Sequence, residues 1–64
     1  MRREFIESSY FQSMRLEILS GYRKIGHAID NYGYDMSKGL IEALQRLQSA
    51  LEAVDKQMEA DCAK

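Results

Sequence analysis

The most constraining feature of the sequence is a run of apolar residues in its second half, spaced alternately four and three positions apart. They are Leu40, Leu44, Leu47, Leu51, Val54 and Met58. Residues with this spacing lie along one face of an α-helix, so the run predicts an amphipathic helix of about five turns. We expect this helix to cover residues 37–60, with Asp35 or Ser37 as its N-cap.

The first half carries a second apolar seam with the same alternation, and it predicts a helix over residues 4–31. Its members are Phe11, Ile18, Tyr22, Ile25, Ile29 and Tyr32, with Arg15 at the seam position between the first two. A bend or break at Ser20-Gly21 is the alternative, because a glycine in a helix interior costs about 0.8–1.0 kcal/mol relative to alanine. We favour one continuous helix, because the seam keeps its phase across Gly21 and Gly26.

The segment between the two helices contains Asn31 and Gly33, which can adopt the positive φ found at helix C-termini. A connection this short makes the helices antiparallel neighbours. The 64 residues include no proline and only four glycines. We therefore expect a single all-α domain over residues 1–64, folded as an antiparallel two-helix hairpin.

Large apolar side chains outside the two seams exceed what a lone pair of helices can cover. They are Phe5, Ile6, Tyr10, Met14, Leu19 and Ile41, with Ala43, Ala50 and Ala53 as smaller additions. Each large apolar side chain left in water loses the roughly 1.5–3 kcal/mol of stabilisation that its burial would give. We expect this surface to meet a protein partner or a second copy, giving a helical bundle. A compact three-helix fold, broken at Ser20-Gly21, is the alternative that buries it internally.

The function predicted from this surplus is that of a small non-enzymatic protein-binding module, which means an adaptor, a co-chaperone or an inhibitor. The residues expected to bind the partner are Phe5, Ile6, Tyr10, Met14, Leu19 and Tyr34. The last of these lies at the predicted tip of the hairpin, and exposed tyrosines bury a large area at low entropic cost.

The charge balance gives no general reason to expect nucleic-acid binding. Nine Lys and Arg residues stand against ten Asp and Glu, for a net charge of −1. The alternative function is a nucleic-acid accessory protein, in which a dimeric bundle aligns Arg15, Arg23 and Lys24 into one patch.

The sequence offers little for catalysis or ligand binding. His27 is the only histidine and Cys62 the only cysteine, so one chain is not expected to hold a metal ion. No glycine-rich phosphate-binding motif is present, and we expect no cofactor and no small-molecule substrate. An enzyme is the third alternative, with Glu52 and Gln48 as its candidate residues.

A single cysteine cannot form an internal disulfide, which favours a reducing compartment. Glu4 and Glu7 interrupt the apolar stretch that a signal peptide would need, and aliphatic residues occur in runs no longer than pairs. We therefore expect a cytoplasmic protein with no membrane-spanning segment.

Residues 39–53 (GLIEALQRLQSALEA) look like the Leu- and Ala-rich second helix of the small E-type co-chaperones of type III secretion needle subunits. The resemblance covers less than half of the chain. It implies a helical hairpin that binds a larger helical-repeat chaperone and helps to keep the needle protein unassembled. The string Gln48-Ser49-Ala50-Leu51-Glu52 is similar to the Ser-Gln-Glu-Leu-Asp motif of small sporulation phosphatases. It has Glu in place of the motif's Asp and departs in the preceding residues, so we do not carry that activity over.

Overall fold

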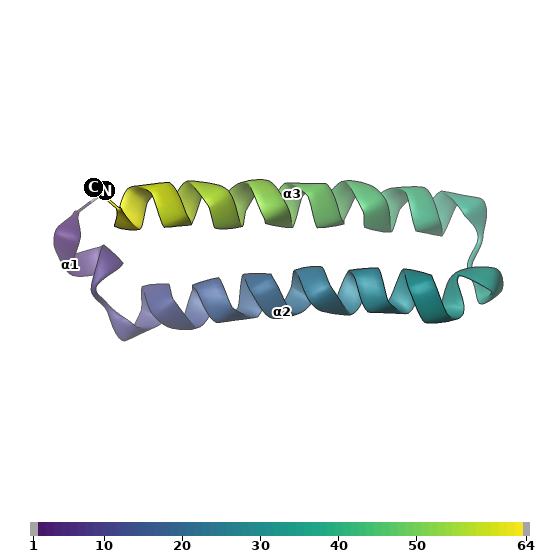
Figure 1. Ribbon diagram of the computed structural model, residues 1–64, viewed down its shortest axis with the longest axis horizontal. Coiled ribbons are helices and arrows are strands. Elements are labelled where there is room, and N and C mark those ends of the chain that lie inside the picture. Colours follow the sequence, from purple (N-terminus) through teal and green to yellow (C-terminus); the bar gives the residue numbers. More distant parts are fainter. Residues whose placement is uncertain (1, 64) are drawn as a thin grey trace.

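The computed structural model describes residues 2–63, which form an antiparallel helical hairpin (Figure 1). The elements in chain order are α1 (Arg3–Ile6), α2 (Ser9–Tyr32), the 3-10 turn η1 (Gly33–Asp35) and α3 (Lys38–Cys62). α2 and α3 lie side by side along the long axis of a molecule that measures 44 × 16 × 13 Å. Residues 2–63 contain no strand, so the prediction of an all-α two-helix hairpin is confirmed.

The break in the first helical segment comes at Ser8, not at Ser20-Gly21, so the predicted helix over 4–31 begins too early. The Ser8 side chain caps α2, because its Oγ accepts a hydrogen bond from the backbone N–H of Phe11 at 3.1 Å. The same hydroxyl donates to the carbonyl oxygen of Phe5 at 2.6 Å, which ties the end of α1 to the start of α2. α2 then continues without interruption through both of its interior glycines.

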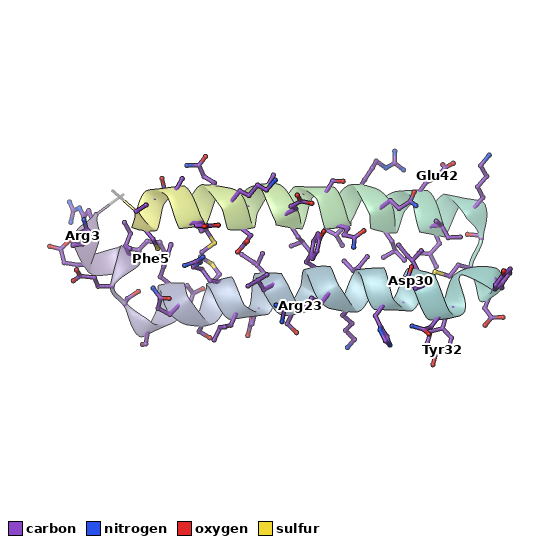
Figure 2. The ribbon with its side chains drawn as sticks, in the orientation of Figure 1. Arg3, Phe5, Arg23, Asp30, Tyr32 and Glu42 are labelled. Carbon is purple, nitrogen blue, oxygen red and sulfur yellow. The ribbon has the colours of Figure 1, made fainter. Side chains whose placement is uncertain are left out.

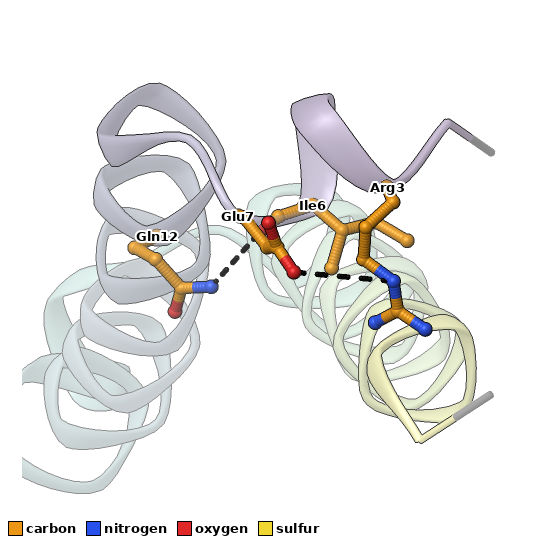
Figure 3. Close-up of polar contacts among 4 residues, drawn as sticks. All are labelled: Arg3, Ile6, Glu7 and Gln12. Carbon is orange, nitrogen blue, oxygen red and sulfur yellow. Dashed lines mark hydrogen bonds and ion pairs between the residues drawn. The ribbon is translucent and has the colours of Figure 1, made fainter.

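The short helix α1 folds across the open end of the hairpin (Figure 3). The side-chain amide of Gln12 holds it there by donating to the carbonyl oxygen of Ile6 at 3.1 Å. Ile6 consequently turns inward and joins Phe11 and Met58 as one of the three buried hydrophobic residues described. The Phe5 ring packs edge-on against Phe11, with centroids 5.3 Å apart. The one tightly packed core of the hairpin therefore lies where all three helices meet.

α3 begins after the turn at one of its two predicted N-caps, but the turn contains no residue with a positive φ. Ser37 is the N-cap, with its Oγ accepting from the backbone N–H of Leu40 at 3.1 Å. Gly33 has a φ of −56°, and no described residue has a positive φ, so the expectation for Asn31 and Gly33 is wrong. A 3-10 turn reverses the chain instead, closed by the N–H of Met36 donating to the Gly33 carbonyl at 3.1 Å.

The predicted seam of α2 faces α3 from Phe11 to Ile29, with each of its residues buried or half-buried. Tyr32 is the exception, because it is 60% exposed and points away from α3 (Figure 2). A straight helix drifts by about 20° per heptad relative to a seam spaced every 3.5 residues. Three heptads after Phe11, that drift has turned Tyr32 away from the seam.

In α3, every second residue that faces α2 lies one position later in the sequence than predicted. The half-buried or buried residues that face α2 are Ile41, Leu44, Gln48, Leu51, Asp55, Met58 and Cys62. Leu40, Leu47 and Val54 were expected in the seam, but they are 47%, 49% and 44% exposed. Contacts across the hairpin explain the shift, because the Gln48 amide occupies the space beside Gly26 and donates weakly to the Tyr22 carbonyl at 3.5 Å.

No helix within residues 2–63 is both long and apolar enough to cross a membrane.

The capping role of Ser8 can be measured directly. Ser8→Ala is expected to lower the free energy of unfolding by about 1 kcal/mol, because an N–H at the start of α2 loses its acceptor. Ser13→Ala, at an exposed position within α2, is the control and should change it by less than about 0.5 kcal/mol. Urea unfolding followed by circular dichroism makes the comparison, and equal stability of the two variants would contradict the assignment of the cap.

Candidate functional site

The largest exposed apolar surface on α3 is a stripe beside the seam. It consists of Leu40, Leu47 and Val54, with the exposed Ala43 and Ala50 next to them, and we call it the α3 stripe. The three large residues are seven positions apart, or two helical turns, so they align along one face. From Leu40 to Val54 the stripe is about 21 Å long at 1.5 Å per residue.

The α3 stripe carries no charge, and its borders are also largely apolar. On one side it adjoins the half-buried seam residues Leu44 and Leu51. On the other side, one position before Leu47 and Val54, lie Arg46 and Ala53. A partner covering the stripe would therefore desolvate few polar groups, which is the condition for a favourable apolar interface.

The opposite flank of α3 is polar. The Tyr22 hydroxyl donates to Glu52 Oε2 at 3.4 Å, and Lys56 Nζ lies 3.0 Å from Glu52 Oε1. The hydrogen bond from Lys56, together with its charge, lowers the pKa of Glu52, and Glu52 in turn raises the pKa of Lys56. Both groups therefore stay ionised at neutral pH.

An open hollow of about 200 Å³ lies beside this polar cluster. It is lined by Leu19, Tyr22, Leu51, Glu52 and Asp55. Gln48 is the other candidate residue of the enzyme alternative. Its side-chain amide donates to the Tyr22 carbonyl inside the hairpin. Within residues 2–63, no group of three His, Cys, Asp or Glu side chains is placed to hold a metal ion.

The six residues predicted to bind a partner do not form one surface. Ile6 is buried and Met14 packs against the buried core, so the expectation that these two lie uncovered is wrong. Leu19 is half-buried, while Phe5 is 40% exposed but leans on Phe11. Only Tyr10 and Tyr34, at 71% and 103%, project freely, and they lie toward opposite ends of the hairpin.

Sequence reasoning missed the α3 stripe because its residues were assigned to the seam. A signal for the correct frame was present, since Ile41, Leu44, Leu51, Met58 and Cys62 also follow helical spacing. That frame puts Gln48 and Asp55 between the helices, which a hydrophobic pattern alone disfavours.

Arg15 and Asp55 are polar members of the seam that are incompletely paired. Arg15 donates from its terminal nitrogen to Cys62 Sγ at 3.7 Å, while its buried Nε has no hydrogen-bond partner among the described residues. The buried Oδ1 of Asp55 likewise has none. Since Arg15 lies between the helices, it is not exposed beside Arg23 and Lys24 to form the patch that the nucleic-acid alternative needs.

Comparisons with protein-family models, with curated proteins and with solved structures found no match to this chain. Its function is therefore inferred from its own geometry.

Replacing Arg15 tests whether its guanidinium, placed in the seam, lowers the free energy of unfolding. Arg15→Met keeps an unbranched side chain of similar length and removes a buried donor without a partner, so the free energy of unfolding should rise by about 1 kcal/mol. Arg23→Met, on the exposed face of α2, is the matched control and should change it by less than about 0.5 kcal/mol. Denaturant titration distinguishes the two, and destabilisation by Arg15→Met would show that the guanidinium supports the hairpin.

Proposed function

We propose that this protein acts by binding another polypeptide through the α3 stripe, as a small non-enzymatic interaction module. The proposal rests on one observation, which is that the hairpin leaves its second apolar face uncovered. Leu40, Leu47 and Val54 are each nearly half exposed although they are large and aligned. Contiguous apolar surface of this kind marks interaction sites on soluble proteins.

The overall dimensions support the same proposal. A compact monomer of 7.4 kDa exposes about 4,200 Å², whereas this hairpin exposes 5042 Å². Its radius of gyration is 14.4 Å, against about 11 Å for a compact domain of 64 residues. The surface in excess of a compact fold is about 800 Å², which is close to the area that each partner contributes to a standard protein–protein interface.

The recognition mode that fits this surface is helix packing. An amphipathic helix laid along α3 would place its own apolar residues between Leu40, Leu47 and Val54 in the manner of helix-in-groove complexes. Adaptor, co-chaperone and inhibitor are roles that share this mode and differ in the partner. A non-enzymatic role is proposed because the hollows between described residues are open, whereas substrate sites usually bury most of their ligand.

Site-specific photo-crosslinking in the native host tests the proposal. Benzoylphenylalanine placed at Leu47, in the middle of the α3 stripe, is expected to give a discrete protein adduct. The same probe at Ser49, an exposed position on another face of α3, should give none.

A second pair of substitutions shows whether the adduct depends on the stripe. Leu40→Asp with Val54→Asp should abolish the adduct from position 47, because two buried carboxylates would oppose the interface. Adducts of equal yield at positions 47 and 49, or no adduct at either, would contradict the proposal.

A further inference from the structure

We infer that the α3 stripe is covered by α3 of a second copy running antiparallel, so that two hairpins form a four-helix bundle. This inference rests on the proposed function and names the partner. Three observations carry it, which are the direction in which the stripe faces, the order of large and small residues along it, and the placement of the residues at its borders.

The α3 stripe faces the direction in which a four-helix bundle needs its second contact. Leu40, Leu47 and Val54 each come one residue before a seam position, and one residue corresponds to about 100° around an α-helix. In a square bundle each helix touches two neighbours roughly a quarter-turn apart. α3 therefore presents one contact face to α2 and a second, unpartnered face at the angle of an adjacent helix.

The order of large and small residues along the α3 stripe makes it complementary to a second α3 stripe that runs antiparallel to it. With a two-fold axis between positions 48 and 49, Leu47 meets Ala50 of the second copy and Val54 meets Ala43 of the second copy. Leu40 meets Gln57 of the second copy at each end. Every large apolar residue is thus opposed by a smaller or flexible one, which lets the layers interdigitate.

The bordering residues also pair without conflict in this register. Arg46 faces Ala53 of the second copy, so the only charge beside the stripe meets no like charge. Leu44 faces Leu51 of the second copy, and both extend the seams of their own hairpins. A parallel arrangement would instead stack Ala43 on Ala43 and Ala50 on Ala50, leaving layers too small to fill the space between helices.

Gly21 on α2 is consistent with this arrangement. A Cβ at Gly21 would meet Leu51 Cδ1 at 3.6 Å, an ordinary contact, so nothing within one hairpin demands a glycine there. Because Leu51 borders the stripe, Gly21 lies on the same side of the hairpin. In the square bundle α2 of the second copy approaches this side, and Gly21 together with the half-buried Ala28 permits a close approach.

Disulfide trapping between copies tests the register and the direction together. Ala43→Cys and Val54→Cys are made separately, each in a full chain that also carries Cys62→Ser. When the two chains are mixed and oxidised, the disulfide-linked dimer should form at least tenfold more than with either chain alone. A disulfide requires Cα atoms about 4.4–6.8 Å apart. In the antiparallel register position 43 of one copy comes this close to position 54 of the other, whereas position 43 does not meet position 43 and position 54 does not meet position 54.

Gln45→Cys mixed with Glu52→Cys, on the polar flank of α3, is the matched control and should give no such enrichment. Efficient cross-linking of Ala43→Cys with itself would overturn the antiparallel arrangement. Absence of enrichment in every mixture, together with a sedimenting mass of 7.4 kDa for the unsubstituted chain, would overturn the second copy as partner. In that case a photo-adduct from Leu47 to a different protein would still support the proposed function, so the two failures are distinguishable.

Discussion

A single line of contact between α2 and α3 is the constraint on which the rest of this structure depends. Two helices side by side can bury only one strip of each, and here only Ile6, Phe11 and Met58 are buried among the described residues. These three lie at the open end, where α1 adds a third wall. Along the rest of the hairpin the seam is half-buried, so any further large apolar residue must lie at the surface. The exposed α3 stripe is the direct consequence.

The polar residues of the seam affect the register between α2 and α3 more than they affect the stability of the hairpin. Gln48 lies against Gly26 and donates weakly to the Tyr22 carbonyl, and Arg15 reaches Cys62. Such contacts contribute little energy, but polar groups between helices favour the one register in which they find partners. A seam of aliphatic residues alone would tolerate sliding, which would move the stripe relative to α2.

The sequence was sufficient for the fold class, the position of the turn and most of the α2 seam, and it offered Ser37 as one of two candidate N-caps, because these features depend on local spacing and capping. It was insufficient for two features that long-range contacts determine. The break at Ser8 depends on α1 folding back onto α2 and α3, through Gln12 and the buried Ile6. The α3 frame depends on which of two sets of residues, one position apart, lies against α2, and the set that does so includes the polar Gln48 and Asp55. The candidate interface was misplaced for the same reason, since the residues assigned to the seam became the uncovered stripe.

The concentration dependence of unfolding tests most directly the central claim that the apolar surface one hairpin leaves exposed is covered by a second copy. If the α3 stripe is buried in an assembly of copies, the urea midpoint should rise with protein concentration. A hundredfold increase should add about 2.7 kcal/mol of apparent stability. A midpoint that stays constant over that range, with a cooperative transition and full helicity, would show that the isolated hairpin is stable with its stripe in water. That result would contradict the claim that the stripe is buried between copies of the chain.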